Sequence, residues 1–285
     1  MLRYLKQARS AFALLSPEAV RARAERPVVV GLVAEGSPAY ADIEDFLMPP
    51  EVSHDKRMQV MQSVHRACDP DTPNKYDLVL YEQGLPCPST AFTFFRDDPQ
   101  RTVDEILEAR QDLWLTLGRN FYPFRKPVVD RVVSAIAREN AIFAVASALP
   151  NILPNLLEMP WALGEFASDT AFITMNQVRM AFMVAAASDK KVGYSEQLAE
   201  LVSIAAGAFG WRALARELVG FIPFGGGLLP KGAIAYAATY VLGKGLEHFH
   251  GVGYGYTRAQ RRAAYRVAYE RGKELMGTVL RKSEA

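Results

Sequence analysis

The first part of the chain alternates short apolar runs with polar stretches. Three apolar runs predict buried strands: PVVVGLVA at 27–34, YDLVLYE at 76–82 and TAFTFFR at 90–96. Between the first two lies YADIEDFL, whose apolar spacing predicts a helix. Because strands that alternate with helices commonly pair in parallel, residues 27–125 predict a small α/β domain with a partly parallel sheet.

A further helix is predicted directly after the third strand. Thr102 and Glu105 have the spacing of a capping box, which satisfies free backbone N–H groups at a helix start. Gly118 predicts the end of this helix, because glycine readily adopts the left-handed conformation found there. The apolar face is supplied by Val103, Ile106, Leu107, Leu113, Trp114 and Leu117.

The pattern changes after the two prolines of FYPFRKP, which predict a linker. Strand signals end, and alanine-rich apolar helices are predicted at 128–149, 168–188, 196–219, 231–249 and 257–281. Ahead of the first strand, Ser16 and Pro17 mark a helix start. The predicted parts are N-terminal helices (1–26), the α/β domain (27–125) and an all-α domain (126–285). The predicted fold class is α+β: a small N-terminal α/β domain followed by a larger all-α domain with apolar hairpins.

Composition and charge exclude several classes of function. The 285-residue chain has a formal net charge of +2, which gives no overall excess of positive charge for nucleic acid. Cys68 and Cys87 lack metal-ligand spacing, and free thiols favour a reducing compartment such as the cytoplasm. His248 and His250 lie at a predicted helix end, where the helix dipole favours a charged imidazole rather than a metal site. Charges interrupt the apolar residues of the N-terminus, so no signal peptide is predicted.

The first predicted strand leads into an incomplete phosphate-binding loop. Gly31 and Gly36 have the spacing of the two glycines in that motif. The motif then requires Lys and Ser or Thr, which neutralise phosphate and hold magnesium, but this chain has Ser37 and Pro38. Pro38 also lacks a backbone N–H, and Glu35 adds a negative charge. We therefore expect no catalytic residues and no cofactor here; a nucleotide-dependent switch with a divergent loop is the alternative.

Several polar residues interrupt the apolar helix predicted at 168–188. They are Asp169, Asn176, Gln177 and Arg179. One interpretation is a polar site inside the helical domain. The other is a hydrogen-bond network between helices, with Arg179 paired to an acid such as Asp169 or Glu165.

Two segments of the helical half carry a family resemblance. They are SDTAFITMNQVRMAFMVAAA (168–187) and AGAFGWRALARELVGFIPFGGGLLPKGAIAYAATYVLGKGLEHF (206–249). In this order they resemble a bacterial family called domain of unknown function six-nine-seven, over about 130–255. The matching positions are Asp169, Thr170, Asn176, Gln177, Val178, Arg179, Met180, Arg212, Arg216, Pro223, Gly225, Ala235, Tyr236, Thr239, Tyr240 and Gly243.

That family consists of helical proteins that are often fused to GTPase domains or encoded near them, and some are inner-membrane proteins. The resemblance implies a GTPase as partner and no enzymatic activity. The incomplete loop at Gly31–Pro38 makes the N-terminal half itself look like a GTPase-like domain whose phosphate loop has degenerated. A small α/β domain with no history of nucleotide binding is the other interpretation.

The apolar hairpin around Gly225–Gly227 has two possible surroundings. Its arms, 218–230 and 232–243, are each shorter than the roughly 20 apolar residues that cross a membrane. The hairpin would therefore enter a membrane to a shallow depth, with Lys231 reaching the headgroups, or pack inside a helical core.

The last predicted helix is rich in arginine and lysine, which is typical of a helix that meets an anionic membrane surface. The other interpretation is a solvated outer face. We expect Arg212, Arg216, Lys231, Arg261, Arg262 and Arg266 to meet the membrane surface or a protein partner. The resulting hypothesis is a non-enzymatic bacterial protein in the cytoplasm, peripheral to the inner membrane or shallowly inserted in it. A soluble scaffold that docks a neighbouring GTPase is a further alternative; the oligomeric state is left open.

Overall fold

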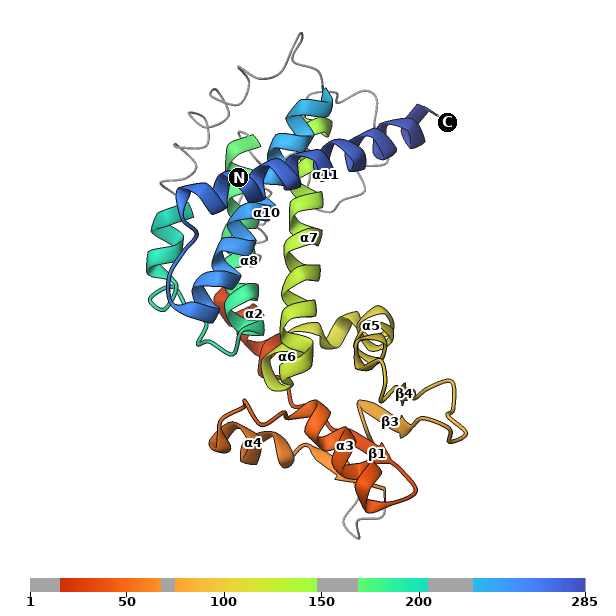
Figure 1. Ribbon diagram of the computed structural model, residues 1–285. Coiled ribbons are helices and arrows are strands. Elements are labelled where there is room, and N and C mark those ends of the chain that lie inside the picture. The colour runs from red at the N-terminus through yellow and green to blue at the C-terminus, as the bar shows by residue number, and fades with distance from the viewer. Residues whose placement is uncertain (1–15, 68–74, 148–168, 205–227, 285) are drawn as a thin grey trace, which may run out of the picture. The chain divides into compact units, whose positions relative to one another are not determined.

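The computed structural model describes residues 16–67, 75–147, 169–204 and 228–284 (Figure 1). The chain divides into two compact units. One, called here the α/β unit, contains Arg21–Val129 together with Ala186–Asp189. The other, the helical unit, contains the remaining described residues. The structure is mostly helical with one small parallel sheet, which confirms an α+β chain.

The α/β unit is built around a four-stranded sheet with the order β2-β1-β3-β4. Its strands are β1 (Val30–Val33), β2 (Val64–Arg66), β3 (Leu78–Glu82) and β4 (Phe92–Phe94). All three strand pairs are parallel, so the sheet is more uniform than predicted. The three predicted strands are confirmed. The strand β2 was not predicted, because its sequence VHR contains one buried apolar residue and two polar ones.

The helices of this unit surround the sheet and supply most of its core. They are α3 (Ser37–Leu47), α4 (His54–Met61), α5 (Pro99–Ala109), a short 3-10 turn η1 (Gln111–Leu113) and α6 (Trp114–Asn120), after α2 (Pro17–Ala24). Ile43 and Leu47 of α3 and Ile106 of α5 are fully buried with Leu32 and Leu80 of the sheet. Burial of such side chains contributes about 1.5–3 kcal/mol each, which offsets the entropy of ordering these elements.

The predicted capping box of α5 is wrong. The helix begins at Pro99, and the side chain of Asp98 accepts a hydrogen bond from the Arg101 N–H. Thr102 is fully buried inside the helix, where its hydroxyl accepts from Phe95 N–H at 2.9 Å. Proline suits the first helical turn and aspartate is a strong N-cap, so this pair sets the start three residues earlier than Thr102.

Gly118 does not end a helix as predicted, but lies inside α6. A Cβ at this position would meet Val128 at 3.1 Å and Ala187 at 3.3 Å. The glycine therefore allows close packing rather than a left-handed turn. The predicted start of the first helix is confirmed, because the Ser16 hydroxyl accepts a hydrogen bond from the Ala19 N–H.

The predicted linker FYPFRKP is also wrong. It forms the first turns of α7 (Tyr122–Ala146), and Pro127 lies inside that helix. Pro123 is tolerated because the first N–H groups of a helix have no partner within it. The predicted boundary at 125/126 thus falls inside a continuous helix, and the two units divide between Val129 and Asp130.

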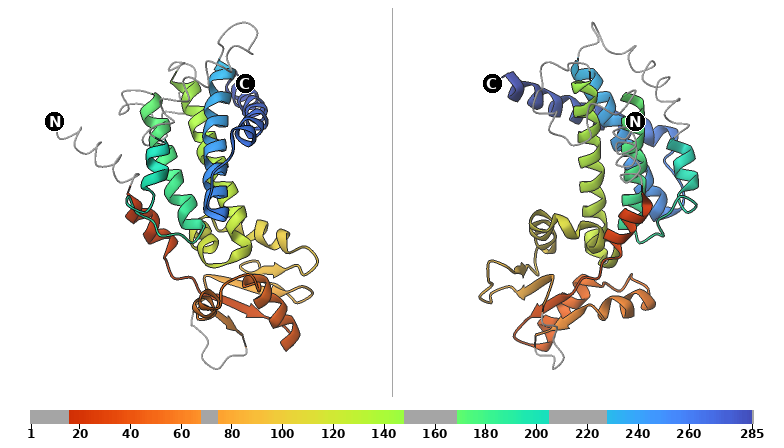
Figure 2. Two further views of the ribbon diagram at one scale, coloured as in Figure 1. Left: turned by 60° about the vertical axis from the view of Figure 1, so that its left-hand side comes forward. Right: turned by 180° about the vertical axis from the view of Figure 1, so that it is seen from behind.

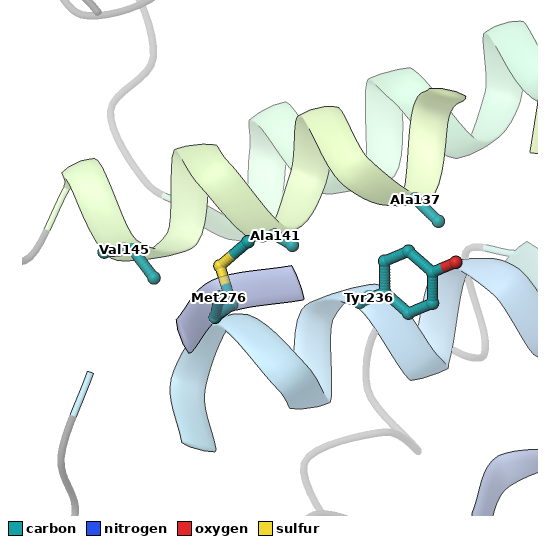
Figure 3. Packing of buried hydrophobic residues seen from close by; sticks show 5 residues of the cluster. All are labelled: Ala137, Ala141, Val145, Tyr236 and Met276. Atoms are coloured by element: carbon teal, nitrogen blue, oxygen red, sulfur yellow. The ribbon is translucent and has the colours of Figure 1, made fainter. Parts of the chain in front are cut away.

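The helical unit contains α7, α8 (Asp169–Ala187), a segment at 198–204, α10 (Leu228–Val252) and α11 (Arg258–Glu284). Figure 2 shows α7, α8 and α10 side by side, with α11 against α10. A buried cluster joins Ala137, Ala141 and Val145 of α7 to Tyr236 of α10 and Met276 of α11 (Figure 3). The four long helices were predicted with slightly different ends, and only the first part of the helix predicted at 196–219 lies within the described residues.

The arm of the apolar hairpin that the structure describes is covered by protein. Of its residues 232–243, Gly232, Ala233, Ala237, Thr239 and Val241 are buried against the other helices. These residues therefore pack against other helices of the chain, and shallow insertion of the hairpin as a whole stays a prediction. Residues 218–227, which include Gly225–Gly227, lie outside the described residues, and residues 228–230 of the other arm form the start of α10, where Leu229 is 40% exposed. No helix within the described ranges is long and apolar enough to cross a membrane.

Candidate functional site

The loop between β1 and α3 has the predicted strand–loop–helix context, but its glycines do not form a phosphate cradle. Gly31 lies within β1, where a Cβ would come within 3.0 Å of the Tyr76 ring. Gly36 caps α3 in an extended conformation, with Ser37 and Pro38 in the first turn. Gly31 is therefore explained by packing against Tyr76, and Pro38 removes one N–H from the helix start.

A carboxylate of the chain itself occupies this loop. Glu82, the last residue of β3, accepts a hydrogen bond from the Glu35 N–H at 2.9 Å. With the strand order 2-1-3-4, the ends of β1 and β3 meet where the chain reverses direction across the sheet. Ligands of such folds bind in that crevice. Here two glutamates lie at it and one backbone donor is already used, so the site disfavours an anionic phosphate.

The polar residues predicted at α8 form a network with α7 and α10. The side-chain amide of Asn140 on α7 donates to the Thr239 hydroxyl at 2.9 Å, and the Asn176 amide donates to the Asn140 side-chain oxygen Oδ1 at 2.9 Å. Gln177 also reaches Thr239, at 3.4 Å. Asn140 and Thr239 are fully buried. Since these groups satisfy one another, the network can fix the register of three helices.

The acid that pairs with Arg179 is Glu139, at 2.5 Å, rather than Asp169. Asp169 is the first residue of α8, a long way along the helix from Arg179, while Glu139 lies on the neighbouring helix α7. Glu165, the other predicted partner, lies outside the described residues. The four predicted polar positions are thus only partly brought together: Asn176, Gln177 and Arg179 share the network.

The start of α11 carries a group of exposed arginines. Arg258, Arg261, Arg262 and Arg266, called here the arginine cluster, lie within nine residues and all are exposed. None of them forms an ion pair with any residue that the structure describes. Within the described residues, the guanidinium of Arg261 donates to the Tyr256 backbone carbonyl, at 3.4 Å.

This helix start is well fixed although its charges are unfavourable there. Thr257 and Gln260 form a capping box: the Thr257 hydroxyl accepts from the Gln260 backbone N–H, and the Gln260 side-chain oxygen Oε1 accepts from the Thr257 backbone N–H. The positive end of the helix dipole disfavours cations in the first turn. Arg258 and Arg261 therefore do not stabilise this helix start.

Of the other cations predicted to meet a surface or partner, the structure describes one, Lys231. Lys231 is exposed at the start of α10 and donates to the Ser147 hydroxyl at 3.2 Å. Arg212 and Arg216 lie outside the described residues. Further along α11, Lys273 pairs with Glu270, so the surplus of positive charge is greatest at the helix start.

His250 at the end of α10 does not make the favourable interaction with the helix dipole that was predicted for it. The side chain of His250 is only 6% exposed. Burial, and second the charge of Lys190, lower the pKa of His250 to about 4, although the Glu200 carboxylate lies 3.9 Å from Nε2. His250 is therefore neutral at pH 7 and no favourable cation at this helix end. Across the described ranges, no three His, Cys, Asp or Glu side chains are grouped to hold a metal.

A charged group that sequence reasoning missed lies at the end of α8. The Asp189 carboxylate is 3.1 Å from Lys56 Nζ, 3.8 Å from Arg119 Nε and 3.9 Å from Arg125 Nη2. These cations come from three separate places in the chain. The only local signal was the basic and acidic residues that follow the apolar run of α8, which gave no indication of their partners.

Comparison of the chain with protein-family models, curated proteins and solved structures gave no match. The resemblance described above therefore remains a prediction.

Proposed function

We propose that this chain is a non-enzymatic protein that binds to the anionic surface of a membrane through the arginine cluster of α11, and that it works together with a GTPase. The single observation that carries the membrane part is the exposure of four arginines with no described ion-pair partner at the start of one helix. In this proposal the protein is cytoplasmic and peripheral at the inner membrane. Residues 232–243 of the predicted apolar hairpin contribute packing between helices.

The strength of such binding follows from the charge of the cluster. Each arginine near an anionic surface contributes about 1 kcal/mol, so four contribute about 4 kcal/mol. That free energy corresponds to roughly a thousandfold in the partition constant. Because the arginines are exposed, the attraction is screened strongly once the Debye length falls from about 10 Å to about 3 Å in high salt.

Flotation of the full chain with vesicles tests this. Vesicles of phosphatidylglycerol and phosphatidylcholine in roughly equal parts should carry the protein upward at about 0.1 M salt. Vesicles of phosphatidylcholine alone should carry far less protein. Replacing the arginine cluster by Arg258→Gln, Arg261→Gln, Arg262→Gln and Arg266→Gln should strongly reduce flotation at this salt concentration. Protein that stays at the bottom with anionic vesicles at low salt would overturn the proposal.

A matched control separates the cluster from net charge. Arg23, Lys75, Arg138 and Lys191 are exposed, dispersed and without an ion pair to any described residue. Changing these four to Gln alters the net charge by the same amount. We expect this variant to float as the wild type does, since its arginine cluster is intact.

We infer that the chain does not carry out nucleotide-driven catalysis, and the position of the Glu82 side chain at the loop after β1 supports this proposal. Titration with a fluorescent GTP or ATP analogue should show no saturable binding. Saturable binding that Ser37→Ala weakens would favour a nucleotide-dependent switch instead.

The GTPase partner rests on the resemblance of residues 168–249 alone. Co-purification of the full chain with a GTPase encoded beside it tests that part. Loss of the GTPase after the arginine-cluster substitutions would indicate that the cluster binds the GTPase rather than lipid.

A further inference from the structure

The arginine cluster is preceded by exposed apolar side chains. Phe249 and Val252 at the end of α10, and Tyr254 in the following loop, are 38%, 50% and 62% exposed. They are called here the apolar tip. Only five residues, Gly253–Thr257, separate α10 from α11. The apolar tip and the arginine cluster are thus consecutive parts of one helical hairpin.

The loop that carries the apolar tip is held in a defined conformation. Gly253 has a φ of 84° and donates its N–H to the Phe249 carbonyl at 2.8 Å, which ends α10. The His248 ring packs against the rings of Tyr254 and Tyr256, with centroids 5.3 and 5.0 Å apart. These contacts fix the loop against the helix end while Tyr254 stays exposed, so little ordering is needed on binding.

The geometry of the α10–α11 hairpin brings the apolar tip and the arginine cluster to the same end of the hairpin. Tyr265 packs with Ala238 and Val241, and Gly272 lies against Ala233, so α11 runs antiparallel to α10. The first turns of α11 therefore lie beside the last turns of α10. The contact of Arg261 with the Tyr256 carbonyl joins the arginine cluster directly to the loop.

We infer that the apolar tip inserts into the interface of the same anionic bilayer whose headgroups the arginine cluster binds. This inference rests on the proposed function and adds a second, uncharged contribution to it. Aromatic side chains with a polar end and arginines are typical of membrane interfaces, and stable attachment usually needs two signals. The charge of the cluster selects an anionic bilayer as occupant over a neutral apolar partner.

The two contributions differ in their response to salt. Binding by the arginine cluster weakens at about 1 M salt, whereas burial of apolar side chains does not. Burial of three partly exposed side chains at the interface should change the partition constant roughly 100-fold. The wild type should therefore keep measurable binding to phosphatidylglycerol-containing vesicles at high salt.

Flotation of the full chain at low and high salt tests this with two triple variants. Phe249→Ser, Val252→Ser and Tyr254→Ser should leave binding at about 0.1 M salt detectable and remove it at about 1 M salt. Met58→Ser, Leu198→Ser and Val202→Ser serve as the control, because these side chains are 55%, 61% and 59% exposed elsewhere. The control should bind as the wild type does at both salt concentrations.

Each result decides between the proposals. Residual high-salt binding that is lost only in the apolar-tip variant supports the inference. Wild-type binding that vanishes at high salt, or survives in the apolar-tip variant, overturns insertion and leaves binding by the arginine cluster standing. No binding at low salt overturns the proposed function itself. Circular dichroism of each variant confirms that it is folded.

Discussion

Asp189 combines an unusual backbone conformation with a cluster of cations. Among the described residues it is the only non-glycine with a positive φ, at 58°. Its N–H donates to the Ala186 carbonyl, and the N–H of Lys190 donates to that of Ala185. This is the pattern that closes a helix with a left-handed residue, a position normally taken by glycine. The carboxylate near Lys56, Arg119 and Arg125 is the feature that glycine would lack.

Two pairs of variants separate the charge from the backbone. Asp189→Asn keeps a side chain that tolerates the left-handed region but removes the carboxylate. The side chain is 27% exposed, so the loss should lie between the values for exposed and buried pairs, at about 2 kcal/mol. Asp189→Gly and Asp189→Ala both lack the charge. Glycine should be more stable than alanine by about 1 kcal/mol, which reverses their order in an ordinary helix.

Urea unfolding followed by circular dichroism gives the free energies. Hydrogen exchange at the amides of Asp189 and Lys190 gives the local effect, because the chain has two units and its unfolding need not be two-state. High salt should reduce the loss in Asp189→Asn without changing the difference between glycine and alanine. Asp45→Asn is the control, since Asp45 is 66% exposed and its ion pair should contribute less than about 1 kcal/mol.

Two results would refute this reasoning. An alanine variant as stable as the glycine variant would show that the left-handed conformation costs nothing at this position. An asparagine variant as stable as the wild type at low salt would show that the ion pairs of this carboxylate with the three cations contribute nothing to the stability of the chain.

Three further predictions follow from the packing, burial and hydrogen bonds of the described residues. Gly243→Ala should destabilise the chain by about 1–3 kcal/mol, because the added Cβ would lie 2.6 Å from Val133 Cγ2. Gly245→Ala is the control: its Cβ would meet nothing within 4 Å, so this variant should be neutral or stabilising in the same urea titration. Burial lowers the pKa of His250 from 6.5 to about 4, so the unfolded chain binds more protons between these values and stability should fall as the pH drops through that window. His250→Gln should flatten this dependence, while exposed His54→Gln should not; an unchanged slope in His250→Gln would contradict the assignment. Thr102→Val should cost about 1–3 kcal/mol, because it leaves the Phe95 N–H unpaired, and a loss below about 0.5 kcal/mol would show that the N–H finds another partner.

Much of the secondary structure could be predicted from local pattern. The strands at Val30–Val33 and Leu78–Glu82 are apolar runs buried in a parallel sheet, and such runs carry a strong local signal. The short strand β2 has no such signal, because it is stabilised by pairing with β1 rather than by its own composition. The start of α5 was misplaced for a related reason: Thr102 has the chemistry of a cap, and only the fold shows that its hydroxyl bonds the backbone near β4.

The candidate sites likewise include features that local sequence predicts and features that only the fold reveals. The missing lysine after Gly36 and the run of arginines at the start of α11 can be read directly from the residues, since both depend on side-chain chemistry at fixed spacing. That the Glu35 N–H bonds Glu82, that Arg179 pairs with Glu139, and that Asp189 lies near three cations depend on residues distant in sequence. The sequence by itself determined the long helices, three of the four strands in the described residues and where charge accumulates. Only the tertiary structure decided which polar groups are neutralised by a partner and which remain exposed, because burial and pairing depend on contacts between distant segments that no local pattern encodes.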